Sequence, residues 1–368
     1  MHAFADGAYD RSSFHICGYA ESCCKIASFL ATYALHTIYE HHHAETTIDH
    51  LENNNNKTQS TSHPYVGIVD HVSVMPLLYP PSHLNLNLNS SSIADTVDQA
   101  NQESRQQSKD ESFVPSSAHG KAAFLIGQAM TTKPLPLSPL SSSHQNEDDE
   151  SNDINLFYYG NADPNNTSLA HVRKHKTSFF KSGGLSMKHH NTEKNGTDTP
   201  KYGTATVGAP LTFVENFNIR LRPGISRSIA ISLARRLRET DGINGKGTYS
   251  GLPGVEALTL PYTNNRLEVA CNLLQPMNND GNNDAIVRAI QQWEEQNQKY
   301  VAIETNEDKS SIVECAYRVG TTEENCWNVL LLQHEEEKKS NEKDDQKKDV
   351  LMTHDINVAQ NFKKYILG

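Results

Sequence analysis

Hydrophobic residues are scarce in this sequence, and they form no long apolar run. They make up 36% of the 368 residues, and the mean hydropathy is -0.62, which is low for a fully packed chain. We therefore expect roughly 230 ordered residues, enough for two small cores of about 100 residues each. No apolar run reaches the ~18 residues that span a bilayer, and the N-terminus lacks a basic region followed by an apolar core. These absences predict a soluble, cytoplasmic protein with no membrane partner.

Basic residues are outnumbered by acidic ones. The chain has 33 Lys and Arg against 44 Asp and Glu, a formal net charge of -11. Binding to nucleic acid or to an acidic membrane surface requires a basic footprint. The charge balance therefore argues against a nucleic-acid partner and favours small-molecule substrates.

Cysteine pairs at the two-residue spacing of zinc sites are also absent. The six cysteines are expected to be reduced, because three of them fall in apolar patterns where a small buried hydrophobe would serve. The three histidines at 41–43, with Glu40 and Glu45 nearby, are metal-ligating residue types. Consecutive histidines point in different directions on a helix, however. We favour a solvated helix end and expect no metal site.

The periodicity of the apolar residues predicts the secondary structure. Steps of three and four predict amphipathic helices, here over 20–40, 118–130, 168–175, 224–239 and 284–300. Apolar runs bounded by turn residues predict strands, here over 154–160, 255–262 and 267–274, with shorter ones over 10–18, 66–74 and 301–303. In the 66–74 segment Asp70 and His71 break the alternation, which predicts a strand buried on both sides or interrupted by a bulge.

Composition divides the chain into two domains. Polar, low-complexity tracts at about 80–117 and 131–153 are typical of disordered insertions. A polar stretch with paired glycines at 181–202 predicts a linker. We therefore place one domain at 1–180 and a second at 203–333, followed by a charged tail at 334–368. The alternation of strands and helices in both halves predicts an α+β protein.

The stretch from Ser62 to Leu77 places a titratable imidazole where a polar loop meets a strand. Pro64 biases His63 towards extended geometry, and Gly67 leaves room for a ligand or another backbone. Imidazole titrates near neutral pH, so His63 is our candidate for a general acid and base.

Several blocks of the chain resemble the glutamate formiminotransferase family. His63-Pro64, followed by x-x-Gly, an aliphatic pair, Asp70 and an apolar run to Pro76, resembles the family's histidine motif, and is closest to the plant and algal formiminotransferase-cyclodeaminase-like chains that lack the cyclodeaminase domain. The strand 156–160 is similar to the family's strand ending in Leu-Tyr-Gly. The segments 203–219 and 268–274 are similar to its Gly-Ala turn, its Phe-Asn-Ile strand and its hairpin.

The resemblance implies a fold and an activity. The family fold is two related α/β-sandwich subdomains, each a sheet covered by helices, with folate held in the groove between them. The implied function is that of a transferase in one-carbon metabolism and histidine catabolism, a glutamate formimidoyltransferase that moves a formimino group from N-formiminoglutamate to tetrahydrofolate. Tetrahydrofolate would be the co-substrate, and His63 would move the proton.

We expect substrate and folate contacts from four residues of the second half. Gly208 and Ala209 are small enough for backbone contact with a flat ligand, and Asn218 offers a donor and an acceptor. Arg220 is one of six arginines between 220 and 238 that would suit the carboxylates of a glutamate-bearing substrate. Each of these residues also has an ordinary structural interpretation. Gly208 and Ala209 could form a tight turn, Asn218 could be an edge residue of a sheet, and the arginines could form a solvated face.

Departures from the family pattern leave a second hypothesis open. Ser62 and Tyr65 stand where the family has an acidic residue and an arginine, and we find neither its first strand with the Pro-Asn-Phe-Ser loop nor its late Leu-Val-Gly-Leu-Val stretch. A non-catalytic folate-binding or scaffold protein that retains the fold is therefore the alternative, and a homodimer also stays open. A hydrolase using Cys23 or Cys24 is more distant, because no base lies nearby in sequence.

Overall fold

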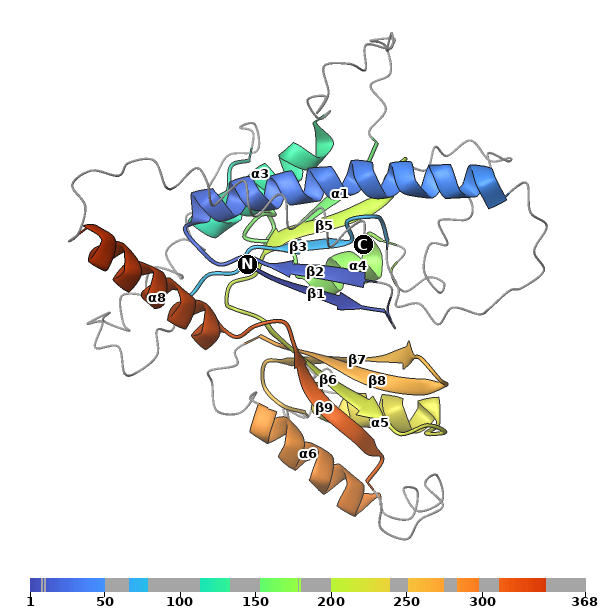
Figure 1. Cartoon of the computed structure of the whole chain (residues 1–368). Helices are drawn as coiled ribbons and strands as arrows, with labels where there is room; N and C mark the ends of the chain where they lie inside the picture. Colours follow the sequence, from blue (N-terminus) through green and yellow to red (C-terminus); the bar gives the residue numbers. More distant parts are fainter. Residues whose placement is uncertain are drawn as a thin grey trace.

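Two sheets with helices against them, together with a separate two-stranded sheet, give the described part of the chain an α+β fold, which confirms the predicted class. The computed structural model (Figure 1) describes residues 1–7, 9, 11–49, 66–78, 113–132, 153–177, 179, 200–238, 251–274, 283–297 and 311–341. His63, most of the predicted insertions and linker, the segment 301–303 and most of the charged tail lie outside these residues.

The first sheet is parallel, with strand order β3-β5-β4. Its strands are β3 (His71–Ser73), β5 (Thr204–Ala209) and β4 (Asn155–Gly160). Helices α1 (Ala20–Asp49) and α3 (Ala118–Thr131) pack on one face, as their apolar spacing predicts. The core between them contains Leu35, Ala123, Ile126, Met130, Ala205 and Val207.

The strand predicted over 66–74 is shorter than expected. Only β3 is regular, and Gly67 makes an isolated bridge with Gly203. The Asp70 Oδ1 atom accepts a hydrogen bond from the Val66 N–H at 3.0 Å. A side chain that binds its own backbone in this way competes with the strand ladder, so the chain turns at Asp70 before β3 begins.

The second sheet is antiparallel, with strand order β7-β8-β6-β9. Its strands are β6 (Glu215–Leu221), β7 (Val255–Tyr262), β8 (Arg266–Leu273) and β9 (Val313–Val319). Helices α5 (Arg227–Leu237) and α6 (Asn283–Gln296) complete the order β6-α5-β7-β8-α6-β9. This is the ferredoxin-like split βαβ arrangement. The buried core includes Ile219, Leu221, Leu233, Val269, Ile286 and Trp293.

The predicted β7–β8 hairpin is confirmed, together with its turn. Asn264 and Asn265 have φ values of 56° and 55°, and β7 pairs with β8 from Tyr262 opposite Arg266 onwards. Asparagine is the residue other than glycine that best tolerates this left-handed region. The asparagine pair therefore closes the hairpin.

The strand β5 lies in a different sheet from the one expected. We assigned residue 203 onwards to the second domain, but β5 is the central strand of the first sheet and pairs with both β3 and β4. The chain changes sheet between Ala209 and Glu215. The polar linker predicted over 181–202 therefore precedes the last strand of the first sheet and does not follow it.

Five elements were not predicted from the sequence or were predicted only in part. They are β1 (His2–Asp6), β2 (Arg11–His15), β5, where a Gly-Ala turn was expected, β9 and α8 (Glu323–Asn341). β1 and β2 form an antiparallel hairpin. Most residues of β9 are exposed, so its sequence shows no clear alternation of apolar and polar residues. The short helix α4 (Leu169–His175) agrees with the prediction.

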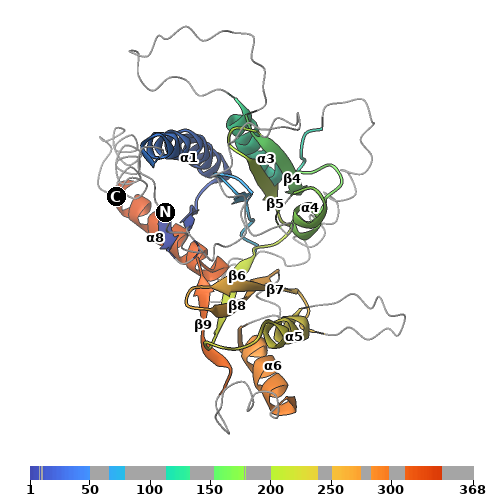
Figure 2. The same ribbon diagram turned by 90° about the vertical axis from the view of Figure 1, so that its right-hand side faces the viewer.

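The two sheets lie between two layers of helices. Both views show α1 and α3 on the far side of the first sheet and α5 and α6 on the far side of the second (Figures 1 and 2). Contacts between the halves include the Val214 N–H with Met75 Sδ at 3.2 Å and the Leu78 N–H with the Glu323 carboxylate. The sheet faces without these helices are therefore turned towards each other.

None of the helices in the described part of the chain combines the length and the apolar character that crossing a bilayer requires.

We predict that Gly208→Ala destabilises the first sheet. A Cβ atom at Gly208 would overlap the ring of Tyr159, and forcing extra volume into a packed site costs about 1–3 kcal/mol. Gly7→Ala is the matched control, because no atom lies within 4 Å of a Cβ added there. Urea unfolding should show a lower free energy of unfolding for Gly208→Ala only. Equal values for the two variants would contradict the packing of Tyr159 on Gly208.

Candidate functional site

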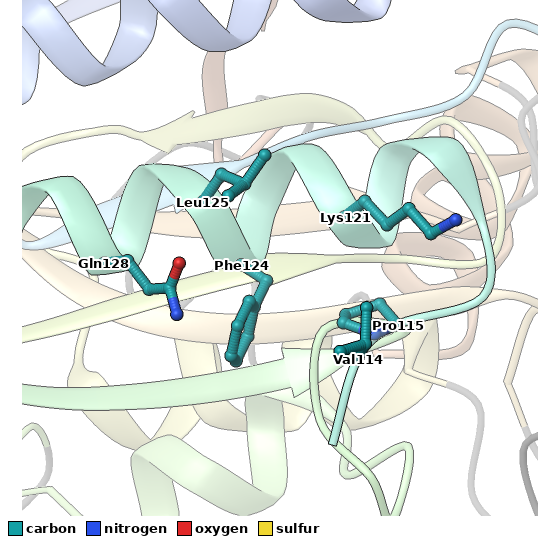
Figure 3. A pocket seen from close by; sticks show the side chains of 6 residues that line it. All are labelled: Val114, Pro115, Lys121, Phe124, Leu125 and Gln128. Carbon is teal, nitrogen blue, oxygen red and sulfur yellow. The ribbon is translucent and has the colours of Figure 1, made fainter. Parts of the chain in front are cut away.

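A hollow on α3 has the wrong chemistry for a catalytic site. Its volume is about 270 Å³, and six residues line it, Val114, Pro115, Lys121, Phe124, Leu125 and Gln128. Figure 3 shows these side chains on α3 and the segment before it. The lining is mostly apolar and contains no pair of groups that would donate and accept a proton. The polar residues between the two sheets are better candidates.

The second sheet has a polar face opposite α5 and α6. Side chains alternate along β6, so Phe217 and Ile219 enter the core while Asn218 and Arg220 project from the other face. The antiparallel register places Asn218 opposite Tyr317 of β9 and Arg220 opposite Glu268 of β8. Residues far apart in sequence thus meet on one surface.

Glu268 is the centre of this polar face. Its side chain is fully buried, and its carboxylate accepts hydrogen bonds from Tyr9 Oη at 2.5 Å, Asn218 Nδ2 at 3.1 Å and Arg220 Nε at 3.2 Å. The Tyr317 hydroxyl also donates to it. A buried carboxylate requires such donors, because it has lost its water.

Arg220 is held from several sides. Its Nη2 atom donates to the Tyr262 hydroxyl at 2.6 Å and to the Tyr317 hydroxyl at 3.0 Å. Its guanidinium carbon lies 4.0 Å from the centre of the Tyr262 ring and 5.1 Å from that of Tyr317. Among the described residues, its hydrogen bonds use Nε and Nη2 only. With 24% of the side chain exposed, Arg220 is a fixed cation whose Nη1 atom makes no hydrogen bond to the described residues.

The tyrosines around Glu268 stay protonated. Burial, together with the hydrogen bond to Glu268 and its negative charge, raises the pKa of Tyr9 and of Tyr317. Both hydroxyls are therefore donors across the physiological range, and we assign them a positioning role rather than a role as bases.

A second polar row runs beside the first. Asn216 Nδ2 donates to Asn272 Oδ1 at 2.8 Å, and Asn272 Nδ2 donates to Glu256 Oε2 at 3.0 Å. This row crosses β6, β8 and β7 at consecutive register positions. The negative charge of Glu256 contributes to the raised pKa of Tyr159 in the first sheet, where burial is the larger cause. The two sheets thus influence each other electrostatically.

The face of the first sheet that is turned towards this surface carries His71. Its Nε2 atom lies 2.8 Å from the Tyr159 hydroxyl. Desolvation lowers the pKa of His71 well below its ordinary value, and the positive charges of Arg173 and Arg11 lower it further. The imidazole is therefore neutral at physiological pH, although His71 is exposed to solvent.

The predicted site residues fall into two groups. Asn218 and Arg220 come together on the polar face around Glu268. Gly208 and Ala209 are buried in β5 of the first sheet, where the flat group against Gly208 is the ring of Tyr159. His63 lies outside the described residues. Four of the other predicted arginines are exposed, and these are Arg222, Arg227, Arg235 and Arg238.

The sequence has no match among the known proteins compared with it. A scan against models of protein families finds none that matches, and a search of curated proteins likewise finds no match. The resemblance to the formiminotransferases therefore enters below as a proposal.

Sequence reasoning missed the acidic centre of the site. Glu268 follows Leu267 and precedes Val269 in an apolar strand, and an acidic residue there is a signal of a buried partner. The partners themselves, Tyr9 and Tyr317, carry no local signal. Among side chains that the structure describes, no group of three His, Cys, Asp or Glu residues is arranged to hold a metal ion.

We predict that Glu268→Gln destabilises the protein strongly. The amide would replace one acceptor oxygen by a donor facing other donors, and breaking a buried ion pair costs about 3–5 kcal/mol. Glu314→Gln is the matched control on β9, because the ion pair of Glu314 with Arg266 is partly exposed, with 37% and 21% of the two side chains exposed, and should cost less than about 1 kcal/mol. The free energies of unfolding of the two variants test this. A similar decrease in the free energy of unfolding in both variants would refute the central role of Glu268.

Proposed function

We propose that this chain transfers a formimino group from N-formiminoglutamate to tetrahydrofolate. The observation that carries the proposal is the fixed, partly exposed Arg220 on a polar face turned towards the other half of the molecule. The resemblance of the His63 motif to the formiminotransferase family supplies the reaction type.

Both substrates suit an arginine on this face. N-formiminoglutamate has two carboxylates, and the glutamate tail of tetrahydrofolate has two more. An arginine that is already oriented loses little side-chain freedom when it binds a carboxylate. Glu268 and the rings of Tyr262 and Tyr317 orient Arg220 in this way.

The reaction requires one group that both removes and returns a proton. Formimino transfer moves an amidine carbon from one amine to another through a tetrahedral intermediate. The attacking amine must lose a proton, and the leaving amine must gain one. A histidine performs both steps near neutral pH, and we assign them to His63.

A non-catalytic folate-binding or scaffold protein is the second candidate. It is favoured by the fact that two predicted ligand contacts are already occupied within the chain. The Tyr159 ring covers Gly208, and the Asn218 amide donates to Glu268. A protein of this kind would retain the fold without the reaction.

We predict that His63→Ala lowers kcat for formimino transfer by about 10²–10⁴-fold, because the general acid and base is lost. The assay follows turnover of N-formiminoglutamate with tetrahydrofolate, and calorimetry follows folate binding, which should persist. His334→Ala, at an exposed position of α8, is the control and should retain full activity. Absence of turnover in the parent chain would reject the transferase and leave a folate binder if heat is released, or a scaffold if it is not.

We predict that Arg220→Lys raises KM for N-formiminoglutamate by about ten- to hundredfold. This is the loss expected when a charged hydrogen bond of roughly 1.5–3 kcal/mol is removed. Lysine keeps a cation beside Glu268, so the variant should fold, and its melting curve checks this. Arg227→Lys is the control, since Arg227 is exposed on α5. An unchanged KM in Arg220→Lys would place the substrate elsewhere.

A further inference from the structure

Three cysteines from two distant segments gather where α8 begins. Cys17 lies in the loop after β2 and Cys23 in α1, whereas Cys326 lies in the first turn of α8. All three are free thiols. Cys326 is near enough to both of the others for its charge to raise the pKa of Cys17 and of Cys23. The three sulfur atoms therefore form one cluster.

The two segments lie directly against each other at two places. Cys17 Sγ is 3.5 Å from the carbonyl oxygen of Cys326, within hydrogen-bonding distance for a thiol. The ring of His15 lies against Gly320, which has a φ value of 87° and where an added Cβ atom would overlap the imidazole. A disulfide requires Cα atoms within about 7 Å of each other. A sulfur so close to the main chain of Cys326 is compatible with that separation.

Cys17 and Cys326 differ in how readily they ionise. A hydrogen bond between their side chains is the largest cause that raises the pKa of Cys17 and the largest that lowers the pKa of Cys326. The Thr321 side chain lowers the pKa of Cys326 further, whereas burial and the charges of Glu323 and Glu215 oppose this. Cys326 is therefore the first of the pair to become a thiolate, the form that reacts with oxidants.

We propose that Cys17 and Cys326 form a reversible disulfide when hydrogen peroxide oxidises the protein. The Cys326 thiolate attacks one oxygen of the peroxide, the O–O bond breaks and hydroxide leaves, so that Cys326 becomes a sulfenic acid. The Cys17 thiol then loses its proton, its sulfur attacks the sulfenic sulfur, and the S–O bond breaks as water leaves. The two sulfur atoms lose two electrons in total, and the peroxide is reduced to water.

The disulfide ties the start of α8 to the first half of the molecule. Cys17 and Cys326 are 309 positions apart in sequence, so the bond closes almost the whole chain into one loop. The same end of α8 already contacts the first half, because the Leu78 N–H donates to the Glu323 carboxylate. Oxidation therefore makes an existing contact between the halves covalent. This site does not depend on the proposed formimino transfer.

Peptide mapping of the full chain after treatment with hydrogen peroxide tests the pair directly. The monomer is taken from a non-reducing gel, its free thiols are alkylated, and it is digested with trypsin and a glutamate-specific protease, because Glu21 separates Cys17 from Cys23 and Cys24. We expect a peptide that links Cys17 to Cys326 and disappears on treatment with dithiothreitol. No linked peptide, or a link from Cys326 to Cys23, overturns the proposal. This measurement requires no variant.

Two variants test the order of the steps. Cys326→Ser removes the thiolate that attacks the peroxide, so Cys17 should stay reduced in it, and oxidation of Cys17 as fast as in the parent overturns the proposed order. Cys24→Ser is the matched control, because Cys24 Sγ lies 3.6 Å from the Ala122 carbonyl oxygen on α3. It should give the linked peptide as the parent does, and loss of the link in this variant would also contradict the assignment.

Discussion

The buried carboxylate of Glu268 is the constraint on which the space between the two sheets depends. A carboxylate removed from water is costly unless donors surround it. Here the donors come from Tyr9 in the turn between β1 and β2, from β6 and from β9. Each of these segments must reach its place before the charge is satisfied. The same hydrogen bonds that satisfy the charge also orient Arg220. The position of the proposed ligand-binding cation is thus a consequence of burying an acid.

Asp70 has a related position in the first half of the molecule, where two arginines approach one carboxylate. Glu268 has one arginine and several neutral donors, whereas Asp70 has two arginines. The N-terminal hairpin joins the two networks, because Tyr9 reaches Glu268 and Arg11 reaches Asp70. A displacement of this hairpin would therefore disturb both acids at once. The hairpin is thus one physical connection between the two halves, beside the contacts of Val214 with Met75 and of Leu78 with Glu323.

The elements that the sequence predicted are those with a local signal. The helices α1, α3, α5 and α6 show apolar steps of three and four, and the β7–β8 hairpin has its asparagine turn. Strand β9 was missed because most of its positions are exposed, and β5 was assigned to the wrong sheet because a polar stretch before it resembles a linker. Arg220 and Asn218 were found from residue type. Glu268, to which both donate, and its further donor Tyr9 were not found, and Tyr9 lies 259 positions from Glu268 in sequence.

The central position of β5 has a consequence for the way the chain folds during synthesis. β3 and β4 make their ladder bonds to β5 and not to each other, so neither has its partner strand until residues 204–209 leave the ribosome. Contacts between residues so far apart in sequence form late and slowly. Until then α1 and α3 have no complete sheet on which to bury their apolar faces. The nascent chain therefore exposes more apolar surface, and is more prone to aggregate, before residues 204–209 are synthesised than afterwards.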